Sequence, residues 1–368
     1  MSILSIITFI FFGALAIQAF YWLSFMRLIF FKSQNKGKRT KPISILVCAW
    51  NEEKNLKELL PVLLEQDHPD YEIVVVDDRS IDGTYDYLLE LREKHDNLKM
   101  VRVDDLPDHM NAKKFAVTLG VKAAKHDLVL LTDADCRPNS PSWAKTMSSS
   151  FSKDVTFVLG FSSYKFSWSP LNLIIQYETL LTGIHYLSRA LWKSPYMGVG
   201  RNLSYKKSFF LKNKGFSGFQ DVLGGDDDLL VNRYANGKNT AICISPDSRV
   251  ESIPKTSWSS YLVQKRRHYA VGKHYRTKDK INLALFSLSQ ILFWICFVTL
   301  AILAVNPYLI AGGFGLRLTL QLIVMGVGAK KLSNKLPIIL LPLLDLIYSV
   351  FLPTIGVPAL LSKKNKWR

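Results

Sequence analysis

The sequence predicts an α/β fold: a doubly wound, mostly parallel, Rossmann-like sheet flanked on both sides by transmembrane helices. Between residues 42 and 275, short apolar runs alternate with stretches of helical length, which is typical of a parallel sheet with crossover helices. Uncharged apolar stretches long enough to cross a bilayer lie at both ends of the chain. Three acidic clusters follow apolar runs or a glycine pair, and ligands of such sheets bind at the carboxyl ends of strands.

Four strands and three helices are expected in the first half of the domain. The strand candidates are at 43–48, 73–76, 98–103 and 128–132, and the apolar, β-branched run at 73–76 is typical of a strand buried on both faces. The helix candidates lie between them, at 51–64, 82–94 and 112–125. The part after about residue 155 is less regular and is expected to shape the acceptor side.

The chain divides into an N-terminal transmembrane anchor (1–31), a soluble domain (42–275) and a C-terminal membrane cluster (281–361). The stretches 1–26 and 282–304 are uncharged, 306–328 carries only Arg317, and 336–361 carries only Asp345. An aspartate is costly in lipid, so we expect Asp345 to face protein or water. Four prolines predict that the last segment is broken and re-entrant, which would return the basic tail 363–368 to the inside.

The formal net charge of +17 points to nucleic acid or to an anionic membrane surface. The apolar spans favour the membrane, with membrane lipids as partners and no nucleic acid. Positive charge follows the first apolar run, which places the N-terminus outside and the soluble domain in the cytoplasm of an inner or plasma membrane. The first of these basic residues are Arg27, Lys32, Lys36, Lys38, Arg39 and Lys41. No cleavable signal peptide is expected, and four scattered cysteines indicate reduced thiols.

Two segments leave alternatives open. Leu171–Trp192 is aromatic-rich and broadly apolar, so it is either a membrane-interface helix or an ordinary amphipathic helix on the sheet. Trp258–Tyr275 is strongly basic just before an apolar span, which favours anchoring to anionic lipid for part of that charge.

The turn Asp133-Ala134-Asp135 is the candidate metal site. Two carboxylates that straddle one residue can face one cation, and Mg²⁺ or Mn²⁺ prefers oxygen ligands and leaves positions for substrate phosphates. A surface turn is the alternative, but the position after a buried strand favours function.

Two further acidic clusters have structural and functional interpretations. In 77–84 we expect Ser80 and Asp82 to cap the following helix, which leaves Asp77 and Asp78 for a base or a metal. The run Asp226-Asp227-Asp228 is a solvated turn or the first turn of a buried helix, where a carboxylate can act as general base. The basic segment 264–268 is either a membrane collar or a source of phosphate contacts.

Taken together and in order, these motifs resemble family 2 glycosyltransferases of the GT-A fold, which are inverting enzymes. The resemblance covers roughly residues 42–270 and rests on the segments 48–53, 77–84, Lys113, 133–135, 225–227 and the pair Gln264 and Arg267. The membrane layout resembles the branch that holds cellulose synthase, hyaluronan synthase and ceramide glucosyltransferase.

The resemblance implies a role for each matching residue. The nucleotide base and ribose would be held by Ala49, Asn51, Glu53 and Asp78, with Asp77 nearby. Lys113 would face the diphosphate, Asp133 the donor and Asp135 the metal. Asp227 would be the general base, with Asp226 in place of the family's glutamate. Gln264 and Arg267 would contact the diphosphate and the acceptor entrance, and His268 replaces the family's tryptophan. The loop 198–203 resembles the family's donor-side loop, and Arg233 stands at the family's usual spacing.

The resulting expectation is a membrane-bound inverting glycosyltransferase that uses a divalent metal. It would move a sugar from a nucleotide-diphospho-sugar, foremost a uridine one, to a hydroxyl of a lipid or lipid-linked glycan acceptor. One alternative is a processive polysaccharide synthase, although three or four helices are few for threading a polymer. An alternative of another class is a catalytically inactive membrane scaffold or sugar-nucleotide sensor.

Overall fold

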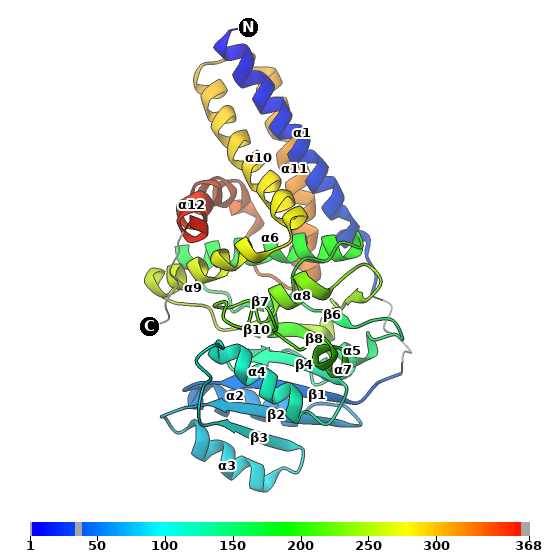
Figure 1. Cartoon of the computed structure of the whole chain (residues 1–368). Helices are drawn as coiled ribbons and strands as arrows, with labels where there is room; N and C mark the ends of the chain where they lie inside the picture. Colours follow the sequence, from blue (N-terminus) through cyan, green and yellow to red (C-terminus); the bar gives the residue numbers. More distant parts are fainter. Residues whose placement is uncertain (1, 34–38, 362–368) are drawn as a thin grey trace. The chain divides into compact units, whose positions relative to one another are not determined.

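A computed structural model describes residues 2–33 and 39–361 of the chain (Figure 1). Lys36, Lys38 and the basic tail 363–368, to which the sequence analysis assigned topological roles, lie outside these residues. The chain forms two compact units. The helical unit comprises the described residues of 1–31, 166–188 and 255–368, and the sheet unit comprises those of 32–165 and 189–254.

The sheet unit contains a seven-stranded sheet of order β3-β2-β1-β4-β8-β6-β9. Its strands are β1 (Ile43–Ala49), β2 (Tyr71–Asp78), β3 (Leu98–Val103), β4 (Leu128–Asp133), β6 (Phe157–Leu159), β8 (Leu203–Lys206) and β9 (Thr240–Ile242). The first four are mutually parallel, and β8 is antiparallel to both of its neighbours. The predicted mostly parallel sheet and all four predicted strands are therefore confirmed.

Helices cover both faces of this sheet because its central strands are apolar on both sides. The helices are α2 (Glu53–Leu64), α3 (Thr84–Lys94), α4 (Ala112–Ala123), α5 (Trp143–Ser149), α7 (Lys207–Lys212) and α8 (Asp228–Tyr234). Ile45 and Val75 join the core under α2 and α5. Leu46 points to the other face, where a Cβ on Gly120 of α4 would lie 2.2 Å from its Cδ1. Only glycine permits this close packing of α4 on β1.

A second, three-stranded sheet of order β5-β10-β7 extends this unit. It consists of β5 (Cys136–Pro138), β7 (Ser162–Tyr164) and β10 (Val250–Ser252), and short 3₁₀ turns lie at η1 (Gly200–Asn202) and η2 (Pro246–Ser248). Ser252 pairs with Cys136 on one side and with Tyr164 on the other. The small sheet therefore begins directly after the Asp133-Ala134-Asp135 turn.

The helical unit contains α1 (Ile3–Phe30), α6 (Pro170–Leu191, whose residues 189–191 belong to the sheet unit), α9 (Trp258–Val271), η3 (Gly272–His274), α10 (Thr277–Ile302), α11 (Pro307–Leu332), η4 (Ile338–Leu340) and α12 (Leu341–Leu361). Within the described residues, four helices are long and apolar enough to cross a membrane: α1, α10, α11 and the segment 338–361.

Three of these helices lie side by side, whereas α12 lies across their direction (Figure 1). Lys331 at the end of α11 bonds the carbonyl of Ile29 at the end of α1, at 2.6 Å, so α1 and α11 run parallel. Tyr21 of α1 bonds the carbonyl of Asn282 near the start of α10, and Phe11 stacks on Phe293, so α10 runs antiparallel to α1.

The predicted cost of Asp345 in an apolar segment is met by protein donors. The Asp345 carboxylate is fully buried and accepts hydrogen bonds from the side chains of Tyr177, Gln290, Trp294, Arg317 and Gln321, at 2.5–2.8 Å. Arg317 lies 2.8 Å from Asp345 and also bonds Gln18 of α1. Two lone charges in separate apolar stretches thus form one buried pair.

The helix predicted at 171–192 packs against this unit through its residues up to 188. Ser188 bonds the carbonyl of Phe25, and His185 stacks on Tyr21 of α1. Glu178, two turns before His185 on α6, is buried and accepts from Tyr261, Lys265 and Tyr269 of α9, at 2.6–2.9 Å. Part of the basic charge predicted for α9 is therefore neutralised inside the protein.

Candidate active site

Strand register brings the predicted acidic motifs to one edge of the large sheet. Ala49 at the end of β1 lies opposite Asp77 of β2, and Cys48 lies opposite Asp133 of β4. Because these strands are parallel, their carboxyl ends meet at the same edge. Asp77 and Asp133 therefore flank the end of β1 on its two sides.

The loops that follow β1 and β2 are hydrogen-bonded to each other. Asn51, held in the left-handed region at φ 56°, accepts the N–H of Ile81 at 2.8 Å and donates its own N–H to Ser80 at 2.9 Å. The Asp82 carboxylate accepts the N–H groups of Glu53 and Thr84. The expected capping by Asp82 is thus present at the start of α3, but the Ser80 hydroxyl instead holds the loop after β1.

The two aspartates that end β2 are buried and differ in their partners. Asp78 is paired with the Arg79 guanidinium at 2.8 Å. Asp77 accepts the N–H of Ser80 through Oδ1, while its Oδ2 is buried with no hydrogen-bond partner. A buried carboxylate oxygen that lacks a donor is costly, and such groups are typical of sites that a ligand completes.

Lys113 of α4 connects two of the acidic motifs. Its ammonium lies 2.9 Å from Asp133 and 3.5 Å from Asp226. Burial works against the charge, but Asp133, Asp226 and Asp227 outweigh it and hold the pKa of Lys113 well above its usual value. The lysine is therefore a permanent cation between the β4 motif and the α8 motif.

The segment that carries the third motif is shaped by glycines and by a buried lysine. Gly224 and Gly225 have φ angles of 79° and 78°, which side chains other than glycine rarely adopt. The fully buried Lys114 donates to the carbonyl groups of Val222 and Gly224. These contacts fix the turn immediately before Asp226.

Asp227 is the N-cap of α8, and both of its carboxylate oxygens accept backbone N–H groups. Oδ2 accepts from Gly200 at 2.6 Å, and Oδ1 accepts from Asp228 at 2.7 Å. Burial and the neighbouring Asp226 charge raise the pKa of Asp227 to about 6, against the opposing effects of Lys113 and the two N–H groups. A carboxylate with such a pKa is a competent base near neutral pH.

Asp135 ends the 133–135 turn, where its carboxylate makes two long contacts. Its Oδ1 lies 3.4 Å from the Ser252 hydroxyl and 3.5 Å from the Cys136 thiol, which are long and weak contacts. Among the described residues, no group of three or more His, Cys, Asp or Glu side chains gathers at metal-binding spacing. Mg²⁺ commonly takes one or two protein carboxylates together with substrate phosphates, and this donor set fits that mode.

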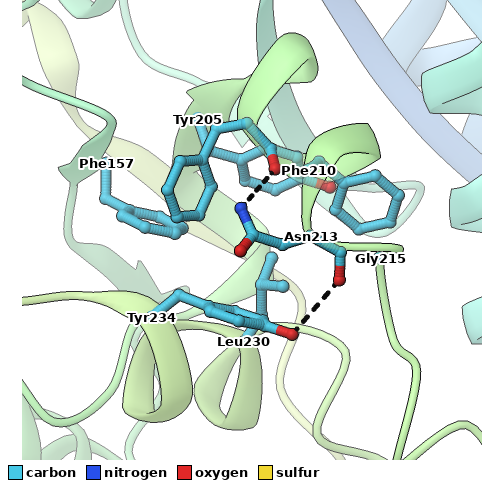
Figure 2. Close-up of a pocket in the computed structure, with 8 residues that line it drawn as sticks. Phe157, Tyr205, Phe210, Asn213, Gly215, Leu230 and Tyr234 are labelled. Atoms are coloured by element: carbon cyan, nitrogen blue, oxygen red, sulfur yellow. Dashed lines mark hydrogen bonds between the residues drawn. The ribbon is translucent and has the colours of Figure 1, made fainter.

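A small hollow opens among these residues, lined by Leu46, Cys48, Lys113, Val117, Leu131, Thr132, Asp133, Gly200 and Asp226. A second small hollow lies beside α7 and α8 and is lined by Phe157, Tyr205, Phe209, Phe210, Asn213, Gly215, Leu230 and Tyr234 (Figure 2). The lining of the second hollow carries no charge. It belongs to the apolar packing that supports α8, whereas the lining of the first hollow includes the charged side chains of Lys113, Asp133 and Asp226.

Three predicted site residues belong to the helical unit: Gln264, Arg267 and His268 lie on α9. Their proposed contacts with the diphosphate and the acceptor remain predictions. Arg233 lies on α8, where it bonds the carbonyl of Ser217 and packs over Phe219, so in this structure it supports the preceding loop.

Several residues at this edge lie outside the site predicted from the sequence. Trp50 directly follows β1 and is 53% exposed, unusual for so large an apolar side chain beside a charged site. The prediction took Lys113 and passed over the adjacent Lys114. The spacing of Lys114 from Val117 and Val121 places it on the buried face of α4. Arg201 was mentioned only as part of a loop.

The fold and its acidic edge define the class: this is an α/β protein of the GT-A type. The mannosyltransferase PcManGT from Pyrobaculum calidifontis, solved in complex with GDP-Man and Mn²⁺, shares this fold with a TM-score of 0.56 and 19% identity, over 90% of this chain and 97% of that one. Residues 44–212 match glycosyl transferase family 2. Over these residues the chain is similar to this family, as the order of its motifs predicted.

Curated relatives are similar over part of their length. A poly-beta-1,6-N-acetyl-D-glucosamine synthase of Staphylococcus epidermidis is 32% identical over 111 residues, which are 30% of this chain and 25% of the relative. A dolichyl N-acetyl-alpha-D-glucosaminyl phosphate 3-beta-D-2,3-diacetamido-2,3-dideoxy-beta-D-glucuronosyltransferase of Methanococcus voltae is 33% identical over 101 residues, 26% of this chain and 30% of the relative. The alignments thus span a quarter to a third of these proteins.

Proposed function

We propose that this protein is an inverting glycosyltransferase that moves a sugar from a nucleotide-diphospho-sugar to an acceptor hydroxyl. The observation that carries the proposal is that Asp77 and Asp133 meet at one sheet edge and that the Lys113 ammonium joins Asp133 to Asp226. Such an acidic edge suits a diphosphate that is bound together with a metal cation, because the cation offsets the repulsion between the carboxylates and the phosphates. The names of the relatives and of PcManGT support this class of reaction.

In the proposed reaction, Asp227 accepts the proton of the acceptor hydroxyl while that oxygen attacks the anomeric carbon. The bond from the anomeric carbon to the diphosphate breaks, and the nucleoside diphosphate departs with the electron pair. The backbone N–H groups of Gly200 and Asp228 keep the Asp227 carboxylate oriented, and Lys113 neutralises charge on the leaving group. In one displacement, the configuration at the anomeric carbon inverts.

Asp135, with Asp133 beside it, would hold a divalent metal, Mg²⁺ or Mn²⁺, which supplies charge neutralisation for the diphosphate when bound. The Mn²⁺ in the PcManGT complex supports this assignment. Asn51, Glu53 and Asp78 at the ends of β1 and β2 would contact the ribose and base. For the nucleoside of the donor, uridine and guanosine are the first candidates.

For the acceptor we favour a lipid or a lipid-linked sugar, because the chain carries four helices able to cross a membrane. The relative from Methanococcus voltae, named for a dolichyl-phosphate sugar acceptor, supports this choice. The relative from Staphylococcus epidermidis, named as a polysaccharide synthase, favours the processive alternative. Product length separates the two, since a single uniform addition excludes processive synthesis.

The first test measures nucleoside diphosphate release by detergent-purified full-length protein from a panel of UDP- and GDP-sugars. Reactions contain Mn²⁺ or Mg²⁺ or a chelator, with membrane lipid extract as acceptor. Metal-dependent release from one donor, lost in Asp227→Asn, is the expected result. Binding of every donor without release, in the wild type and with extract present, would favour the sensor alternative.

We also propose that the chain crosses the membrane three times and that α12 lies in the inner leaflet. The parallel course of α1 and α11, with α10 antiparallel, gives three crossings. α12 stays against α6 and α9, because Tyr348 lies over Tyr177 at 5.3 Å and Phe351 stacks on Tyr261 at 5.9 Å. Its other face exposes apolar side chains to lipid, among them Leu343, Ile347 and Val350.

This orientation is tested by labelling single introduced cysteines in intact cells with a membrane-impermeant maleimide. Tyr308→Cys, at the exposed start of α11, is expected to react from outside. Lys335→Cys, before α12, and a cysteine in a C-terminal tag are expected to react only after permeabilisation. Labelling of the tag from outside would show that α12 spans the membrane.

A further inference from the structure

The 3₁₀ turn η1 (Gly200–Asn202) is fixed on both sides of Arg201. Gly200 donates its N–H to Asp227 at 2.6 Å. The buried Asn202 amide donates to the carbonyl groups of Phe161 and Ser248, at 2.8 and 2.7 Å, and its oxygen accepts from the Trp143 indole. The turn is therefore rigid, and its central residue is presented from a defined position beside the proposed base.

The guanidinium of Arg201 has an aromatic partner and no hydrogen-bond partner at one end. Its Cζ lies 4.2 Å from the Tyr164 ring centroid. Its Nη1 is buried, and within the described part of the chain no acceptor reaches it. A buried guanidinium N–H without an acceptor is unfavourable, so a site that retains one is expected to receive the acceptor from a ligand.

Arg201 lies near the carboxylates of the 133–135 turn. Tyr164, Ser252 and Cys136 lie in one row across β7, β10 and β5, and the Ser252 hydroxyl lies 3.4 Å from Asp135. Burial works against the charge of Arg201, but Tyr164, Cys136, Asp135 and Asp133 outweigh it and raise its pKa. One cation, Lys113, thus lies beside Asp133, and a second lies near Asp135.

Resting on the proposed function, we propose that Arg201 binds the distal phosphate of the nucleoside diphosphate, the phosphate to which the sugar is attached. A planar guanidinium stacked on a tyrosine presents a rigid pair of N–H donors, which matches phosphate oxygens. Lys113 and Arg201 would then neutralise the leaving diphosphate from the two ends of the 133–135 turn. The alternative is that Arg201 only balances the charge of the carboxylates.

Calorimetry with nucleoside diphosphate and nucleoside monophosphate, at saturating Mn²⁺, tests this role. Arg201→Met is expected to weaken diphosphate binding by about tenfold or more, the size of a charged hydrogen bond, and to change monophosphate binding less than twofold. Arg201→Lys keeps the positive charge but lacks the paired N–H donors of the guanidinium, so we expect a loss of diphosphate affinity between those of the wild type and Arg201→Met. Arg189→Met is the matched control, because Arg189 also lies over a tyrosine but bonds Ser194.

Three results would overturn the inference. Equal effects of Arg201→Met on diphosphate and monophosphate would place the residue elsewhere in the site. Tighter binding of Mn²⁺ alone, with an unchanged diphosphate-to-monophosphate ratio, would show charge balance only. A wild-type protein that binds no nucleoside diphosphate would refute the proposed function together with the inference. If Arg201→Met melts below the assay temperature, Arg201→Lys decides.

Discussion

The raised pKa of Asp227 predicts the acid limb of the pH–rate profile. A general base works only when ionised, so kcat at saturating donor should rise with pH through about 6 and level above 7. At pH 5 only about a tenth of Asp227 would be ionised, which predicts about a tenfold lower rate than the plateau. Release of nucleoside diphosphate, measured in buffers from pH 4.5 to 8.5, gives the limb directly.

Two neighbours of Asp227 should shift this limb in opposite directions. Asp226→Asn removes a like charge and should move the limb to lower pH, whereas Lys113→Met removes an opposing charge and should move it to higher pH. Limbs that stay in place in both variants would refute the assignment of Asp227 as the base.

Asp227→Asn is the stability control for these measurements. Burial holds the Asp227 pKa above its unfolded value, so ionisation of this group costs stability once the pH exceeds that unfolded value. The shift of about two pKa units is worth at most roughly 3 kcal/mol, from which the loss of one N–H acceptor must be subtracted. The inactive variant should therefore melt at or above the temperature of the wild type near pH 7.5.

Three further predictions concern other parts of the molecule. Lys114→Met removes the donor to the carbonyl groups of Val222 and Gly224, so we expect a loss of about 1–3 kcal/mol in a denaturant melt and a marked loss of turnover. Chelation should abolish diphosphate binding, and Asp135→Asn should raise the Mn²⁺ concentration needed to restore it; calorimetry in EDTA that shows unchanged binding would contradict the metal assignment. Arg317→Met or Asp345→Asn should each lower the free energy of unfolding by up to about 3–5 kcal/mol, seen as a lower melting temperature in detergent. The double variant Arg317→Met, Asp345→Leu should melt above either single variant because it leaves no unpaired buried charge.

The strand and helix pattern was predictable because the central parallel strands β1, β2 and β4 are largely buried on both faces. The runs around Ile73–Val76 and 128–132 contain no charged residue, and turn signals bound them. The order of acidic residues after strand ends then placed Asp77 and Asp133 at one edge. Parallel register is sufficient for this, since it brings the ends of neighbouring strands together.

Other features divide into those that a local pattern predicts and those that depend on contacts between residues far apart in the chain. Helical phase predicts which of Lys113 and Lys114 is buried, because Lys114 is in phase with Val117. The pairing of Arg317 with Asp345 was within reach, since each is the single charge of an apolar stretch. The association of α9 with α6 through Glu178 could not be predicted, because nothing in either segment of the sequence indicates which other segment it contacts.

At the proposed donor site, Asp77 Oδ2 and Arg201 Nη1 are buried with no hydrogen-bond partner among the described residues, and Asp226 Oδ2 has an ion pair with Lys113 at 3.5 Å but no hydrogen bond. Each lowers the stability of the free protein, and a bound diphosphate with its metal would satisfy oxygens and N–H groups together. Ligand binding should therefore stabilise the sheet unit, by about 2.7 kcal/mol at a ligand concentration one hundred times Kd. We expect nucleoside diphosphate with Mn²⁺ to raise the melting temperature of the wild type. We expect the same for Asp226→Asn, because the Asp226 carboxylate lies beside Lys113 and not beside Asp135, the proposed metal ligand. Stabilisation by Mn²⁺ alone of the same size would show that these groups are completed by the metal and that the diphosphate adds nothing to them.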